Sequence, residues 1–217
     1  MNEPVKLIID IEKENGAMGY IVNSEDGISN EVVLAGRSIV TIPENERTLK
    51  IYSLLEENCG ITFCTTQTLD DFMFYPVPVF SIFAFDYEGN CFGTIGGMSD
   101  IEDDNYPVGF VNHDGRYGKI SDSLKEFLKL VIFFQYWRDI IRYEQMGISY
   151  DLNVMEMKQT ENESGYYACQ CEITEILKLT KNPKSIELLR SNIRRTSEFV
   201  VYSSKNEAQI ANTFLSE

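Results

Sequence analysis

The most continuous apolar run of strand length in the chain lies at residues 79–85, with the sequence VFSIFAF. The turn-forming residues YEGN follow it closely, and a second apolar segment, CFGTI, comes directly after them. Two apolar segments around a short turn predict a β-hairpin, and the unbroken first segment predicts a strand that is buried on both faces.

The glycines in and after this second segment allow a competing interpretation, a phosphate-binding loop. Gly93, Gly96 and Gly97 match neither of the two glycine spacings typical of nucleotide loops, and no lysine follows them. The next residues, MSDIEDDNYP, are acidic and would repel an anion instead of starting a helix that binds it. The hairpin is therefore the favoured interpretation.

A second hairpin is predicted at residues 107–120, PVGFVNHDGRYGKI, where Asp-Gly at positions 114–115 supplies the positive φ of a tight turn. A helix is predicted directly after it. Ser123 and Glu126 have the spacing of a capping box, in which the serine oxygen and the glutamate carboxylate each accept from a backbone N–H of the first turn. The apolar face of this helix consists of Leu124, Phe127, Leu128, Val131 and Phe134.

The first 80 residues give less uniform signals. Residues 3–14 fit a helix or a strand, and a second apolar stretch occupies residues 31–39. A helix is predicted within residues 41–60, with Pro43 at its start and Gly60 at its end. The segment YPVPVF at residues 75–80 marks the start of the buried strand, because proline is tolerated where a strand begins.

The chain after residue 134 has a mostly helical pattern, with a short strand at residues 198–204 and a final helix at residues 206–215. Pro183 is predicted in a first helical turn. We therefore expect an α+β domain at residues 1–134 and a mostly helical extension, packed on it, at residues 135–217. Residues 178–205 contain seven basic and two acidic residues, which favours packing of this basic segment onto the acidic remainder.

The chain has a formal charge of −15, from 34 acidic and 19 basic residues. This balance argues against general nucleic-acid binding, for which lysine and arginine supply most of the affinity. It suits a basic partner, and solubility alone is the alternative explanation. The start of the chain lacks the apolar region of a signal peptide, and no apolar segment approaches the roughly 20 residues that span a bilayer. We expect a cytoplasmic protein that does not enter membranes.

Candidate catalytic residues are scarce. The chain has a single histidine, His113, which excludes zinc sites that need two histidines. His113 lies in the predicted NHDG turn and is expected to be a turn residue. There is no G-x-S-x-G motif, and the five cysteines have neither zinc nor disulfide spacing. We expect no cofactor and no metal. The acidic residues Asp100, Glu102, Asp103 and Asp104 lack EF-hand spacing, and they suit a solvated loop, a partner surface or a hard cation.

The order of the predicted elements resembles the SUKH superfamily, which includes yeast cell-wall-assembly regulators and bacterial immunity proteins. The similarity covers about residues 27–134. Ile42-Pro43 and the turn at 58–60 are similar to the family's Leu-Pro and Asn-Gly positions. The segments FAFDYEGN at 83–90 and DSLKEFL at 122–128 are similar to its hairpin and helix motifs.

The resemblance implies a twisted, mostly antiparallel sheet flanked by helices, and a protein that binds other proteins without catalysis. The leading hypothesis is a cytoplasmic immunity protein that neutralises a cognate toxin domain by occluding its active surface, with acidic residues that steer a basic toxin such as a nuclease. The partner-binding residues would be Asp100, Glu102, Asp103, Asp104 and Tyr106. The alternative is a regulatory scaffold of the yeast type that binds a host protein. An enzyme that uses the acidic loop is a third hypothesis, which the single histidine and the missing motifs disfavour.

Overall fold

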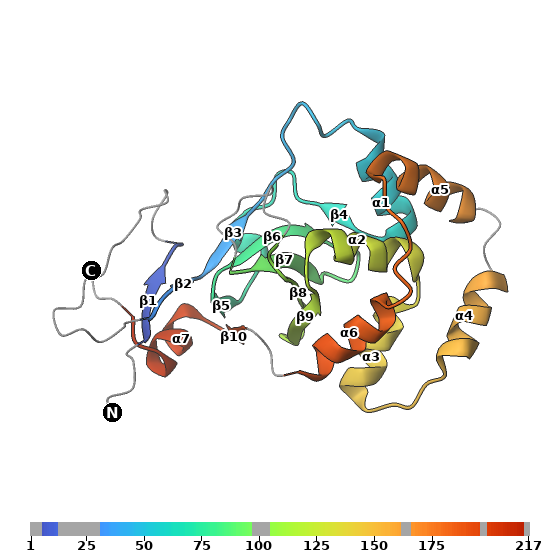
Figure 1. The fold of residues 1–217 in the computed structure, drawn as a ribbon. Coiled ribbons are helices and arrows are strands. Elements are labelled where there is room, and N and C mark those ends of the chain that lie inside the picture. Colours follow the sequence, from blue (N-terminus) through green and yellow to red (C-terminus); the bar gives the residue numbers. More distant parts are fainter. Residues whose placement is uncertain (1–5, 13–30, 97–104, 162–165, 196–198, 215–217) are drawn as a thin grey trace.

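The computed structural model describes residues 6–12, 31–96, 105–161, 166–195 and 199–214. The fold is α+β, as predicted (Figure 1). Its centre is a mixed sheet in the order β3-β6-β7-β8-β9, with β4 pairing to β6 beside β3. These strands are β3 (Arg37–Ile39), β4 (Thr62–Phe63), β6 (Phe80–Phe85), β7 (Cys91–Ile95), β8 (Val108–Val111) and β9 (Tyr117–Ser121). The pairing is antiparallel except between β3 and β6.

Both predicted hairpins are present. Strands β6 and β7 pair from Phe80 with Ile95 to Phe85 with Cys91, and β6 is buried along its first five residues. Gly93 lies inside β7 and not in a phosphate loop: a Cβ there would be 2.7 Å from the carbonyl oxygen of Ser81, so the strand requires a glycine. In the β8–β9 turn, Gly115 has the predicted positive φ, 76°.

The main core lies between this sheet and five helices, with Phe127 and Trp137 among its most deeply buried side chains. The helices are α1 (Lys50–Cys59), α2 (Leu124–Phe133), α3 (Trp137–Met146), α5 (Tyr166–Leu177) and α6 (Ser185–Arg194). Helix α4 (Leu152–Glu161) lies at the far edge of this group (Figure 1). At the start of α2, the Ser123 hydroxyl accepts from the N–H of Glu126, as predicted, whereas the Glu126 carboxylate accepts from Lys129 and Asn182.

Helix α1 begins later than the sequence predicted. Its last residue is followed by Gly60 with φ 61°, as expected, but its first residue is Lys50 and not a residue near Pro43. Residues 44–48 form turns instead, in which the N–H of Glu46 donates to the carbonyl of Pro43. These residues are polar and bury no apolar face, so no packing favours a helix there. Pro183 likewise precedes α6, which begins at Ser185, and is not in its first turn.

A second group of elements lies at the opposite end of the sheet from α4 (Figure 1). It contains β1 (Lys6–Asp10) parallel to β2 (Glu31–Ala35), β5 (Tyr75–Val77) antiparallel to β10 (Val200–Tyr202), and α7 (Lys205–Ala211). The short 3-10 helix η1 (Leu69–Asp71) contacts β3 of the central sheet. Residues 6–10 thus form a strand, one of the two alternatives that the sequence left open. Lys205 forms an ion pair with Asp10, which joins the two ends of the described chain.

The division of the chain at residue 134 stays a prediction, but the two parts share one core. Ile140 of α3 and Leu189 of α6 lie in the same apolar cluster as Phe92 of the sheet and Phe127 of α2. The basic segment also pairs with carboxylates: Lys181 with Glu156, Arg190 and Arg194 with Glu144, and Lys205 with Asp10. Over the residues that the structure describes, no helix has both the length and the apolar character needed to cross a bilayer.

Candidate functional site

Four of the five predicted partner-binding residues, Asp100, Glu102, Asp103 and Asp104, lie outside the described residues. Tyr106, the fifth, is half-buried in the turn that leads into β8. The predicted acidic surface therefore remains a prediction.

The turn between β6 and β7 is held by one buried carboxylate. The side chain of Asp86 is fully buried. One of its oxygens accepts from the backbone N–H groups of Glu88 and Asn90, both at 3.0 Å, and the other accepts from the side-chain amide of Asn90 at 3.0 Å. An aspartate that bonds to the backbone two and four residues later fixes the shape of a turn.

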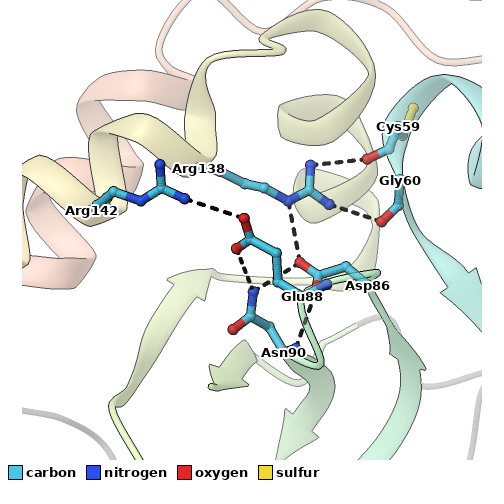
Figure 2. A network of polar contacts seen from close by, with 7 residues as sticks. All are labelled: Cys59, Gly60, Asp86, Glu88, Asn90, Arg138 and Arg142. Carbon is cyan, nitrogen blue, oxygen red and sulfur yellow. Dashed lines mark hydrogen bonds and ion pairs between the residues drawn. The ribbon is translucent and has the colours of Figure 1, made fainter. Parts of the chain in front are cut away.

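Arg138 of α3 connects this turn to the end of α1 (Figure 2). Its Nε lies 3.3 Å from the Asp86 carboxylate, and its two terminal nitrogens donate to the carbonyls of Cys59 and Gly60 at 3.0 and 2.9 Å. The last carbonyls of a helix have no partner within the helix, so the guanidinium satisfies groups that would otherwise need water. The same guanidinium carbon lies 4.4 Å from the ring centre of Trp137. One side chain thereby fastens α1, α3 and the turn together.

Tyr87 lies at the tip of this turn, between the buried Asp86 and the half-buried Glu88, and 82% of it is exposed. The side chain of Tyr87 is therefore exposed to solvent, while the hydrogen bonds of Asp86 fix the backbone of the turn that carries it. Glu88 adds a contact to α3, since its carboxylate lies 3.3 Å from Arg142 (Figure 2). The Asp86 carboxylate is fully buried and bonded within the protein, so it is not accessible to a partner.

Two depressions flank the turn. The first, which we call the α3 cleft, has a volume of about 590 Å³ and an apolar floor of Phe92, Phe110, Trp137 and Ile141. Its rim carries both signs of charge: Glu88 pairs with Arg142, and Asp114 lies 3.2 Å from the exposed His113, which is a turn residue as predicted. Arg116 also lines the rim. Because its charges are mixed, this cleft does not select for a charged ligand of one sign.

The second depression, which we call the α1–α3 groove, has a volume of about 340 Å³. Glu56 and Glu57 of α1 line it on one side and Tyr87 on another, with Val131, Trp137 and Arg138 also in its wall. Glu56 and Glu57 are both exposed. The groove is therefore acidic and bordered by an exposed aromatic ring.

Three of the five cysteines are buried. Burial raises the pKa of the thiols of Cys59, Cys64 and Cys91 to about 12, so these cysteines stay protonated and are poor nucleophiles. Among the described residues, no group of three or more histidine, cysteine, aspartate or glutamate side chains is placed to hold a metal ion.

The sequence contained a signal for the Asp86 turn, because D-x-x-G-N after an apolar strand is the pattern of an aspartate that bonds to its own turn. It contained no comparable signal for Arg138, which is 52 residues away and reaches Asp86 only through the fold.

Comparisons with protein-family models, curated proteins and solved structures found no match for this chain.

Proposed function

We propose that this protein is a non-enzymatic binding module of the immunity type, which occludes the active surface of a basic, nuclease-type toxin domain. The single observation that carries the proposal is Tyr87, an aromatic side chain that is 82% exposed on a turn held by the buried Asp86–Arg138 pair. The resemblance to the SUKH superfamily supports the same class of function.

An exposed tyrosine on a fixed turn has the properties of an interface anchor. Tyrosine, tryptophan and arginine dominate the binding energy of protein interfaces, and an anchor that is already positioned loses little conformational entropy on binding. Asp86 accepts from the backbone N–H groups of Glu88 and Asn90, which follow Tyr87, so Tyr87 is displayed by a backbone that is ordered before any partner arrives.

The charge of the chain supports a basic partner. A formal charge of −15 attracts a basic domain over several ångströms and raises the rate of encounter. In this proposal Tyr87 is the anchor, and the carboxylates of Asp100, Glu102, Asp103 and Asp104 contribute to the attraction of the basic partner.

Coexpression tests the proposal. The product of the neighbouring gene, as the candidate toxin, is expressed alone, with the wild-type protein, with Tyr87→Ala and with Met73→Ala. Met73 is the matched control, because it is a large apolar residue that is 85% exposed on a different part of the surface. We expect growth arrest with the toxin alone, survival with wild type and Met73→Ala, and loss of survival with Tyr87→Ala.

Failure of the wild-type protein to restore growth, or equal protection by wild type and Tyr87→Ala, would contradict the proposal. If the neighbouring product is not toxic but binds the protein through Tyr87, the regulatory scaffold is the better description. Circular dichroism of each purified variant verifies that it is folded.

A further inference from the structure

We infer that the α1–α3 groove receives an arginine side chain of the partner, with its guanidinium against Glu56 and Glu57 and beside the ring of Tyr87. This inference rests on the proposed function, and it names the chemical group that the groove recognises. The groove would thus bind part of the basic partner, in addition to the acidic residues at 98–106.

The shape of the groove suits a single side chain. Its volume of about 340 Å³ is at the lower end of ligand pockets, and its walls come from three separate elements: the end of α1, the β6–β7 turn and the start of α3. Val131 and Trp137 lie at the base of the groove and are almost fully buried, so its accessible apolar surface comes from the ring of Tyr87, which is 82% exposed. A long, partly apolar side chain with a charged head matches this combination of surfaces.

The charge of the groove favours a cation. The last turn of α1 carries Glu56 and Glu57 and contains no basic residue. The carboxyl end of a helix has a partial negative charge, so acidic side chains are unfavourable there and a cation is favourable. Two carboxylates at this end therefore create a local negative potential that the helix itself does not relieve.

The cation already present does not cancel this potential. Arg138 donates to Asp86 and to the carbonyls of Cys59 and Gly60, so its charge is matched by the buried carboxylate and the helix end. The contact of Glu56 is with a neutral group, the hydroxyl of Thr62 at 3.1 Å. Arg138 contributes one positive charge against the three carboxylates of Asp86, Glu56 and Glu57, which leaves two negative charges at the groove.

Tyr87 explains the preference for arginine over lysine. The planar guanidinium stacks on aromatic rings and bonds to carboxylates through two parallel N–H groups, whereas the lysine ammonium is a compact point charge. The same type of stacking occurs in the wall of the groove, where Arg138 lies over the ring of Trp137. The α3 cleft on the other side of the turn is a natural comparison, because it is charge-balanced and gives a free cation no such advantage.

A titration with single amino-acid derivatives tests the groove without a partner. The full chain labelled with ¹⁵N is titrated with N-acetyl-arginine amide and, separately, with N-acetyl-citrulline amide, which has nearly the same shape and no charge. The sole tryptophan, Trp137, lines the groove, so its indole signal and the amides of residues 56–60 and 87 report on binding. We expect shifts of these signals with the arginine derivative and at least threefold smaller shifts with the citrulline derivative.

Variants locate the binding. Glu57→Gln and Tyr87→Ala should each weaken arginine binding at least threefold, while Glu44→Gln, which neutralises an exposed carboxylate in the 44–48 turns, should leave it unchanged. Equal shifts with citrulline, or equal weakening by Glu44→Gln and Glu57→Gln, would overturn the inference, because binding would then reflect shape alone or the overall acidity of the chain.

The coexpression assay separates this inference from the proposed function. Glu57→Arg should abolish protection by repelling the partner's arginine, whereas Glu44→Arg should protect as well as wild type. Protection by wild type and Glu57→Arg alike refutes the groove and leaves the immunity function standing. Absence of protection by the wild-type protein refutes the immunity function, whatever the titration shows.

Discussion

Asp86 and Arg138 form an ion pair whose carboxylate is fully buried and whose guanidinium is 21% exposed. Replacing Asp86 with alanine removes the acceptor for two backbone N–H groups and leaves the charge of Arg138 partly buried without its partner. Loss of one member of a buried pair costs about 3 to 5 kcal/mol. We expect a decrease of about that size in the free energy of unfolding, measured by urea titration.

The neighbouring pair between Glu88 and Arg142 is the control for this experiment. Its side chains are 34% and 54% exposed, and exposed ion pairs contribute about 0 to 1 kcal/mol. Arg142→Met should therefore change the unfolding free energy by less than about 1 kcal/mol. Similar losses in Asp86→Ala and Arg142→Met would mean that the turn is not held by its buried carboxylate.

Phe127 is the centre of the aromatic core. It is fully buried, and its ring centre lies 5.4 Å from that of Phe92, 5.9 Å from Phe83 and 6.2 Å from Trp137. Phe127→Ala should lower the free energy of unfolding by about 3 to 5 kcal/mol through lost burial and the cavity left behind. The matched control is Ile210→Ala, at a site 89% exposed, which should cost less than about 0.5 kcal/mol. A loss below about 1 kcal/mol for Phe127→Ala would show that this face of α2 is not core.

Glu144 makes the stability depend on pH. Hydrogen bonds from Arg194, Tyr150 and Arg190 outweigh the effect of burial and lower the pKa of this carboxyl from 4.5 to about 2. A lowered pKa stabilises the fold above about pH 4.5, and this contribution is lost as the pH falls toward 2. Water screens the exposed side chains of Arg190 and Arg194, so the contribution is smaller than that of a fully buried pair.

Glu144→Gln should therefore be less stable than wild type at pH 7, and the difference should shrink progressively between about pH 4.5 and pH 2. Denaturant titrations at several pH values measure it, with Glu175→Gln, at an exposed position, as the control. A difference between wild type and Glu144→Gln that does not change with pH would contradict the assigned role of the carboxylate.

The acidic loop should act on the rate of association. Neutralising Asp100, Glu102, Asp103 and Asp104 together removes charges that attract a basic partner, and such charges act chiefly on the on-rate and its salt dependence. Stopped-flow mixing with the toxin domain at low and high salt should show slower association and a weaker salt dependence for the quadruple variant, with unchanged thermal unfolding. An unchanged association rate at both salt concentrations would show that these four residues do not contribute to binding of the toxin domain.

The sequence predicted the elements whose signals are local. The two hairpins follow from apolar runs around turn residues, and the end of α1 follows from Gly60, because each depends on a few adjacent residues. The start of α1 was predicted wrongly, since Pro43 marks a turn whose polar residues bury nothing. The ion pair between Asp86 and Arg138 could not be predicted, because the two residues meet only when α3 packs on the sheet. The groove depends on the same packing.

The affinity of the purified toxin domain for this protein and its variants tests the central claim most directly. Isothermal titration compares wild type, Tyr87→Ala and Met73→Ala, two variants that each remove a side chain more than four-fifths exposed. An interface anchor contributes at least about 2 kcal/mol, which corresponds to a roughly 30-fold change in Kd. We predict at least that weakening for Tyr87→Ala and less than about a twofold change for Met73→Ala. Equal affinities of Tyr87→Ala and Met73→Ala would contradict the claim that this turn is the partner-binding site.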